Sequence, residues 1–234
     1  MGITLALLAL GIALLVWFIC EKIKAYTVKA AIIKSLVSVL FIAVAVWGWY
    51  CSGLDVFGVF VVLGLVFGLL GDIWLDLKYV FPQEDGIFTY AGFAVFAVGH
   101  VLYTAGMLLR YYLPGNPLYI MLPLCLAVLL STGNLMLEKP MKLNFGKLRG
   151  LVVLYGILLF STMFISGALS LLHGWREMPL NLIFAGSILF ALSDLILSGT
   201  FFGSGRDKPV DIALNYLSYY PAQFLIALSL MFVR

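Results

Sequence analysis

The chain consists of long, uninterrupted apolar stretches separated by short polar connections. A bilayer core about 30 Å thick requires about 20 apolar residues in a helix. Eight stretches meet this requirement, and they run approximately over Ile3–Cys20, Ala31–Tyr50, Leu54–Trp74, Ile87–Leu109, Leu118–Leu137, Leu148–Leu172, Pro179–Thr200 and Ile212–Val233. None alternates apolar and polar residues as the strands of a membrane β-barrel do. The pattern predicts an all-α, polytopic transmembrane helical bundle with eight spans, formed by a single integral membrane domain over residues 1–234.

The composition excludes several classes of protein. Of the 234 residues, 64% are hydrophobic and only 11% are charged, whereas about 25% are charged in an ordinary soluble domain. So few charges cannot cover a soluble globule or keep a chain disordered. The formal net charge of +3 is too small to attract a polyanion. A soluble enzyme and a nucleic-acid partner are therefore not expected.

The basic residues predict an orientation in the membrane. Eleven of the 14 Lys and Arg residues lie in or beside the connections that follow the first, third, fifth and seventh spans. The other three are Arg110, Arg176 and Arg234. Because cytoplasmic loops carry the excess of Lys and Arg, the odd-numbered connections are predicted to be cytoplasmic. Both termini are then predicted on the non-cytoplasmic side.

Two aspartates interrupt the apolar spans. Asp72 lies near the end of the third span, and Asp194 lies in an otherwise apolar part of the seventh. A charge inside a span costs at least about 2.5 kcal/mol on insertion scales, so such residues are functional candidates by default. At about 1.5 Å of rise per residue, Asp72 lies about 27 Å and Asp194 about 22 Å below the outer boundary. Both belong to the cytoplasmic third, where they would share a pocket if the two spans are neighbours.

The surroundings of the two aspartates resemble each other. The segment Leu70–Leu75 is similar to Leu192–Leu197, and the two aspartates are four spans apart. A parallel repeat of four plus four spans, with a site between the halves, would produce this similarity. Chance similarity between two short segments is the alternative.

Further polar residues are expected at the same depth, namely Lys34, Asp76, Asn215, Tyr219 and Tyr220. Together with the aspartates they would line a cavity on the cytoplasmic side. The alternative is anchoring at the membrane interface, where long side chains extend their polar ends into water. His100 lies higher, about 20 Å from the cytoplasmic boundary. A structural hydrogen bond between helices is the other interpretation of this histidine.

The residue types favour carboxylate chemistry. A catalytic zinc ion usually takes three protein ligands, and the spans contain one histidine with no cysteine near it, so no metal site is predicted. No G-x-S-x-G, P-loop or dinucleotide fingerprint is present. Two neighbouring carboxyls that share one proton offer an acid and a base together. Such a pair suits hydrolysis through an activated water or protonation of an acid-labile bond.

Four short motifs occur in order along the chain: Gly71-Asp72, Phe96-x3-His100-x2-Tyr103, Ser193-Asp194 and Tyr220-x2-Gln223. With them the chain resembles, over nearly its whole length, the YhhN family of eight-span proteins, which includes the lysoplasmalogenases. The resemblance implies hydrolysis of the vinyl ether bond of a lysoplasmalogen. The products would be a fatty aldehyde and glycerophosphoethanolamine or glycerophosphocholine, with no metal or organic cofactor. The expected partners are a lysophospholipid substrate and membrane lipids, and the expected location is a bacterial inner (plasma) membrane.

The implied reaction assigns roles to the polar residues. A vinyl ether is labile to acid, since protonation of its β-carbon gives an oxocarbenium ion that water captures. Asp72 and Asp194 are the predicted catalytic residues, one donating the proton and the other stabilising the cation and activating water. Predicted substrate-binding residues are Lys34, for the lipid phosphate, with Asn215, Tyr219, Tyr220 and Gln223. Predicted supporting residues are Asp76, His100, Tyr103 and Ser193.

Two other functions fit two aspartates within spans. A proton-coupled transporter or lipid-binding protein would use them as a proton relay. An intramembrane aspartyl protease is the second alternative, although its G-x-G-D motif would require Gly68 one residue closer to Gly71-Asp72. Product formation in detergent separates an enzyme from a transporter, and turnover of lipid or peptide separates the two hydrolases. The sequence does not predict the oligomeric state.

Overall fold

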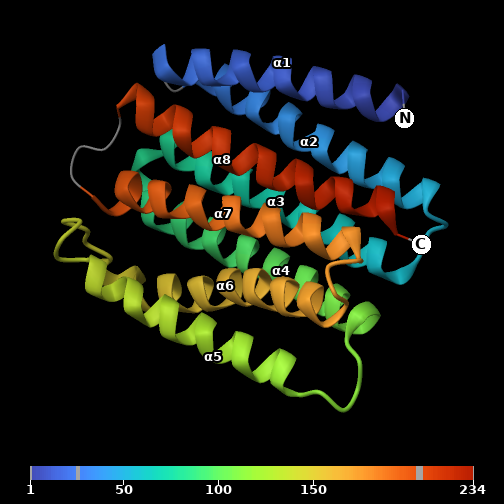
Figure 1. Ribbon diagram of the computed structural model, residues 1–234. Coiled ribbons are helices and arrows are strands. Elements are labelled where there is room, and N and C mark those ends of the chain that lie inside the picture. The colour runs from blue at the N-terminus through green and yellow to red at the C-terminus, as the bar shows by residue number, and fades with distance from the viewer. Residues whose placement is uncertain (1, 25–26, 204–207, 234) are drawn as a thin grey trace.

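The computed structural model describes residues 2–24, 27–203 and 208–233, and these form a bundle of eight long helices (Figure 1). The helices are α1 (Gly2–Lys24), α2 (Val28–Cys51), α3 (Val56–Val80), α4 (Asp85–Tyr111), α5 (Leu118–Gly133), α6 (Arg149–Leu172), α7 (Met178–Phe202) and α8 (Pro209–Leu228). Short 3₁₀ turns lie at Pro82–Glu84, Asn134–Leu137, Gly146–Leu148 and Ser229–Phe232. The predicted all-α class is confirmed. Two residues used in the orientation argument, Arg206 and Arg234, lie outside the described residues.

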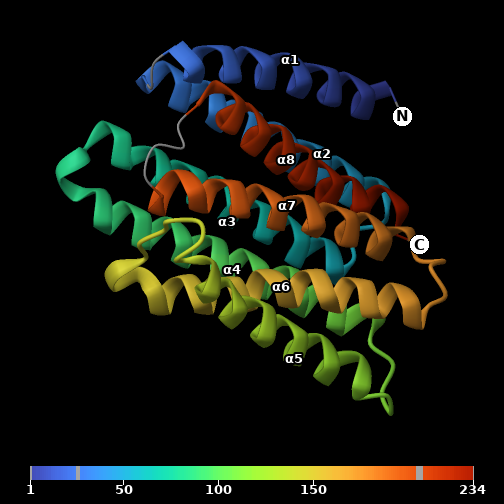
Figure 2. The same cartoon turned by 60° about the vertical axis from the view of Figure 1, so that its left-hand side comes forward.

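Seven of the eight helices, α1 to α7, have the length and apolar composition of a membrane span. The chain is therefore an integral, multi-pass membrane protein. Helix α8 differs because it is more polar: its buried side chains include Asn215, Tyr219, Tyr220 and Gln223. Both views place α8 between α2 and α7, whereas α1 and α5 lie on opposite outer sides of the bundle (Figures 1 and 2). Polar residues are tolerated in α8 because neighbouring helices, rather than lipid, surround them.

Glycines bring α3 and α4 close together. A Cβ atom on Gly64 would lie 2.3 Å from the Tyr103 ring, and one on Gly71 would lie 2.6 Å from the Phe96 ring. Small residues allow helix backbones to approach closely in membranes. The close approach places Gly71, the residue before Asp72, against the ring of Phe96 on α4.

The packing pattern of the first four helices recurs in the last four. In each half, consecutive helices pack on one another. The second helix of each half also packs against the fourth helix of the other half: α2 packs on α8, and α6 packs on α4. This arrangement supports the parallel repeat suggested by Leu70–Leu75 and Leu192–Leu197. Helices α3 and α7, which carry the two aspartates, are equivalent in this scheme. They do not pack closely together but face a common cavity.

Candidate functional site

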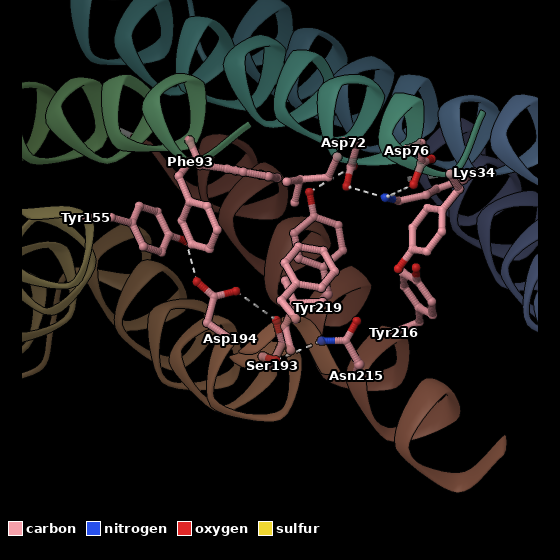
Figure 3. A pocket seen from close by; sticks show the side chains of 15 residues that line it. Lys34, Asp72, Asp76, Phe93, Tyr155, Ser193, Asp194, Asn215, Tyr216 and Tyr219 are labelled. Atoms are coloured by element: carbon pink, nitrogen blue, oxygen red, sulfur yellow. Dashed lines mark hydrogen bonds and ion pairs between the residues drawn. The ribbon is translucent and has the colours of Figure 1, made fainter. Parts of the chain in front are cut away.

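A small polar cavity lies between α2, α3, α4, α6, α7 and α8, where the predicted site residues meet. Its volume is about 40 Å³, enough to hold water next to polar partners. Both predicted catalytic residues line it, Asp72 from α3 and Asp194 from α7 (Figure 3). Lys34, Asp76, Ser193, Asn215 and Tyr219 also line it. The structure therefore brings together seven of the predicted site residues, drawn from four helices.

Asp72 is held by a cation and two hydroxyl groups. Its Oδ1 atom lies 3.1 Å from the Lys34 Nζ atom, and Oδ2 accepts hydrogen bonds from Ser38 at 2.8 Å and Tyr219 at 2.9 Å. The side chain is buried, with a relative exposure of 3%. A buried carboxylate is tolerated when it is paired and hydrogen-bonded. This environment suits the ionised form of Asp72.

Lys34 lies between two carboxylates. Its Nζ atom is 3.0 Å from Asp76 Oδ1 as well as 3.1 Å from Asp72, and its side chain is 5% exposed. The group of Lys34, Asp72 and Asp76 carries one net negative charge when all three are ionised. Sequence analysis predicted that Lys34 would bind a lipid phosphate; in the structure its ammonium group is instead occupied by the two carboxylates.

A buried chain of hydrogen bonds leads to Asp72. Tyr103 donates to Gln223 Oε1 at 3.4 Å, and Gln223 Nε2 donates to the Tyr219 hydroxyl at 3.0 Å. Tyr219 donates in turn to Asp72. Tyr220 donates to the backbone oxygen of Lys34 at 3.1 Å. Tyr103, Tyr220 and Gln223 therefore surround and orient the residues of the cavity without lining it.

Asp194 has a different environment. The hydroxyl of Tyr155 donates a hydrogen bond to its Oδ2 atom, and Ser193 Oγ lies 3.5 Å from its Oδ1 atom (Figure 3). Asn215 donates to the backbone oxygen of Ser193 at 2.7 Å and so ties α8 to this part of α7. Among the described residues, no Lys, Arg or His forms an ion pair with Asp194. Asp194 is half-buried, and it lacks the cation that stabilises the charged form of Asp72, so its environment favours the neutral acid more than that of Asp72 does.

The two aspartates face one cavity without touching each other. Asp72 is bonded to Lys34, Ser38 and Tyr219, and the hydrogen bonds of Asp194 go to Tyr155 and Ser193. Sequence analysis predicted a pair of neighbouring carboxyls that share one proton. The arrangement here separates them and gives each its own partners.

His100 lies behind the cavity rather than in its wall. Its Nδ1 atom is 3.2 Å from Thr162 Oγ1, and its ring packs edge-on against Tyr155, with centroids 5.8 Å apart. The histidine is 2% exposed. It therefore joins α4 to α6 and supports the ring of Tyr155, which is the structural interpretation given above.

Sequence analysis did not single out Tyr155 or Tyr216, although both line the cavity. Tyr216 also lies beneath the Lys34 ammonium, 5.7 Å from ring centroid to Nζ. Aromatic residues are common in membrane helices, so Tyr155 alone did not stand out.

The repeat relates the partners of the two aspartates. Lys34 lies on the second helix of the first half, 38 positions before Asp72, and Tyr155 lies on the second helix of the second half, 39 positions before Asp194. Corresponding places in the two halves thus hold a cation and a neutral phenol. The site is symmetric in backbone arrangement but asymmetric in charge.

The model of the YhhN family matches residues 29–230. The chain belongs to the YhhN family. The match begins at the start of α2 and ends after α8, so it includes every residue of the polar cavity in this YhhN protein. Comparisons with curated proteins and with solved structures found no match.

Proposed function

We propose that this YhhN protein is a lysoplasmalogenase-like ether hydrolase. It cleaves the vinyl ether bond of a lysoplasmalogen to a fatty aldehyde and glycerophosphoethanolamine or glycerophosphocholine. The observation that carries the proposal is the charge asymmetry of the cavity. The buried carboxyl of Asp72 is paired with a lysine, and the half-buried carboxyl of Asp194 is bonded to hydroxyl groups. An acid-labile bond requires a proton donor and a fixed negative charge in one place, and this cavity offers both.

The proposed topology has eight spans, with α8 as the eighth and both termini on the non-cytoplasmic side of a bacterial inner membrane. Two observations support it. Successive helices run in alternating directions, and both ends of the described chain lie at the same end of the bundle (Figures 1 and 2). The 20 residues of α8 also suffice to cross a bilayer core. The polar cavity then lies in the cytoplasmic third, at the end opposite the termini.

In the proposed reaction Asp194 donates a proton to the β-carbon of the vinyl ether. The resulting oxocarbenium ion is stabilised by the carboxylate of Asp72, which also orients a water molecule. Water adds to the α-carbon, and the proton that it releases passes to the Asp194 carboxylate, giving a hemiacetal. The hemiacetal collapses to the aldehyde and the alcohol of the glycerophospholipid headgroup. The net reaction consumes one water and regenerates both aspartates.

Tyr155 is the positioning residue for the proton donor in this scheme. We expect Tyr155→Phe to lower kcat by about tenfold, the range expected when one hydrogen bond to a charged or polar reacting group is lost. The ring contacts with Phe93 and His100 remain in the variant, with centroids at 5.1 and 5.8 Å in the wild type. The measurement is the steady-state rate of aldehyde release.

Tyr111→Phe is the matched control for this substitution. Tyr111 lies at the far end of α4, and its buried hydroxyl has no hydrogen-bond partner among the residues that the structure describes. Its loss is therefore expected to leave kcat unchanged. An equal effect of both substitutions would show that Tyr155 acts only through packing.

The headgroup is proposed to bind outside the polar cavity, because about 40 Å³ cannot contain a glycerophosphate group. An adjoining opening of about 160 Å³ shares Tyr79, Asn215 and Tyr216 with the cavity and is also lined by Lys22. Lys22 lies in the last turn of α1, with its Nζ atom 3.9 Å from the centroid of the Tyr79 ring. Lys22 is thus better placed than Lys34 to meet a phosphate.

We expect Lys22→Gln to raise KM about three- to fivefold with little change in kcat, the effect of losing one solvent-accessible ion pair. Lys24→Gln is the control, since Lys24 is two residues away, 74% exposed and paired with Glu21. Kinetics at low and high salt would check the assignment, because screening by salt should reduce the difference in KM between the wild type and Lys22→Gln. An unchanged KM in Lys22→Gln would move the phosphate site elsewhere.

The first experiment is to measure aldehyde release from a lysoplasmalogen by purified protein in detergent, with a chelator present. Release by the wild type supports the reaction and the expected independence of metal ions. A diacyl phospholipid and a peptide serve as control substrates. Absence of aldehyde would contradict the proposed reaction.

A proton-coupled transporter is the second candidate. The observation in its favour is the buried hydrogen-bond chain from Tyr103 through Gln223 and Tyr219 to Asp72. Such chains can carry protons through a membrane protein. Substrate uptake that requires a proton gradient in vesicles, with no product in detergent, would favour this candidate over the hydrolase.

A further inference from the structure

A second, larger cavity adjoins the polar one. It lies between α6, α7 and the connection from α5 to α6, with Leu130 of α5 at its edge. It has a volume of about 340 Å³ and is lined almost entirely by apolar side chains. Pockets that bind small ligands start at about 300 Å³, and an apolar cavity of about 150 Å³ already binds benzene. This second cavity, called the apolar cavity below, is therefore large enough to hold a substantial hydrocarbon group.

The apolar cavity meets the polar cavity at the proposed proton donor. Phe93, Tyr155, Asp194 and Leu197 line both. A ligand that extends from one cavity into the other thus passes the hydrogen-bonded pair of Tyr155 and Asp194. The polar cavity has ionic and hydroxyl groups on one side of this pair, and the apolar cavity has aliphatic and aromatic groups on the other.

The lining of the apolar cavity also gives its extent along the bundle. Along α6 the cavity reaches from Val152 to Met163, which is about 16 Å at about 1.5 Å per residue, with Tyr155 about one turn from its Val152 end. On α7 it includes Ile188 and Leu192, which are 44% and 47% exposed on the outer face of the bundle. Helix α5 packs mainly on α6, so the cavity is bounded by α5 on one side and α7 on the other. A chain from the bilayer could enter between these two helices.

We propose that the apolar cavity binds the single hydrocarbon chain of the lipid substrate, with the reacting end of the chain at Asp194 and Tyr155. The identity of the reacting bond rests on the proposed function. The binding of a hydrocarbon chain in this cavity does not depend on it. A single-chain lipid fits this arrangement because its one hydrocarbon chain enters the apolar cavity while the headgroup of the lipid remains on the side of the polar cavity. The chain enters laterally from the bilayer between α5 and α7.

The test uses a lysophospholipid whose chain carries a photoactivatable diazirine near its middle. The purified wild-type protein is irradiated with this probe in detergent, and the labelled peptides are identified by mass spectrometry. We expect adducts on α6 and α7 around Met163 and Ile188, reduced by an excess of unlabelled lysophospholipid. Adducts spread over the outer helices, or not reduced by the competitor, would overturn the proposal.

A pair of matched variants tests the same site. Ala191 lines the apolar cavity, whereas Ala13 is exposed on α1, which lies on the side of the bundle opposite α5 (Figures 1 and 2). Ala191→Phe fills part of the cavity and is expected to reduce labelling by at least about tenfold, the effect of losing a few methylene contacts. Ala13→Phe is expected to label as the wild type does. Equal labelling of both variants would overturn the proposal. Size-exclusion profiles identify a misfolded variant. If a variant is misfolded, the positions of the adducts on the wild-type protein decide instead.

Aldehyde release, measured on the same preparations, separates the two proposals. Labelling in the apolar cavity without aldehyde would support the chain site and contradict the reaction. Aldehyde with adducts outside the cavity would support the reaction and overturn the chain site. If both hold, Ala191→Phe should lower kcat/KM by at least about tenfold for a long alkenyl chain and much less for a very short one.

Discussion

Asp194→Asn is expected to lower the rate of aldehyde release by at least about 100-fold, because general acid catalysis typically contributes that much or more. Asparagine has nearly the same shape as aspartic acid and can still accept a hydrogen bond from Tyr155. It cannot donate an acidic proton to carbon. The loss should therefore appear in kcat, with little change in KM or in thermal stability. The measurement is aldehyde release by purified variants in detergent with a chelator.

Asp211→Asn is the matched control for this prediction. Asp211 lies in the first turn of α8 and does not line the polar cavity. Its rate should equal that of the wild type. Wild-type activity in Asp194→Asn would exclude Asp194 as the proton donor. The other two carboxyls that line the cavity, Asp72 and Asp76, are both paired with Lys34. Asp72→Asn, tested in parallel, should also lose activity because the oxocarbenium ion would lose the carboxylate that is proposed to stabilise it and to orient water.

Lys34→Met is expected to destabilise the protein by about 3–5 kcal/mol, the usual effect of removing one partner from a buried ion pair. The Lys34 side chain is 5% exposed and lies within 3.1 Å of both Asp72 and Asp76. Without it, two carboxylates would face each other in the interior with no cation between them. The measurement is the thermal unfolding midpoint in detergent, together with the yield of folded protein.

Two comparisons isolate the buried charge in this experiment. Lys29→Met removes an exposed cation, since Lys29 is 58% exposed and pairs with Glu21, and it should change stability by less than about 1 kcal/mol. Combining Lys34→Met with Asp72→Asn and Asp76→Asn removes the whole charged group and should restore most of the lost stability. A fully stable Lys34→Met variant would show that the two carboxylates are neutral in the folded protein.

The membrane spans and the two aspartates were predictable because they are local properties of the chain. A span depends on the length and composition of one continuous segment, and Asp72 and Asp194 each stand out against apolar neighbours. Helix α8 marks the limit of this reasoning. Asn215, Tyr219 and Gln223 make it more polar than the other seven helices, and only its position between α2 and α7 explains why that polarity is tolerated.

The partners of the site residues could not be read from the sequence in the same way. Sequence reasoning assigned Lys34 to a phosphate and paired Asp72 with Asp194. In the structure Lys34 is held by Asp72 and Asp76, and Asp194 is bonded to Tyr155. These contacts join residues 38 to 42 positions apart, so they depend on which helices pack together and on how each is rotated.

The sequence by itself determined that this chain is a helical membrane protein, that it has the motifs of the YhhN family and that two carboxyls lie at a similar depth within its spans. The tertiary structure decided which of those carboxyls meets a cation. The physical reason is that insertion into a membrane depends on one helix at a time, whereas the electrostatic environment of a buried group depends on the side chains that neighbouring helices bring to it. Packing of α2 against α3 places an ammonium beside Asp72, and packing of α6 against α7 places a phenol beside Asp194.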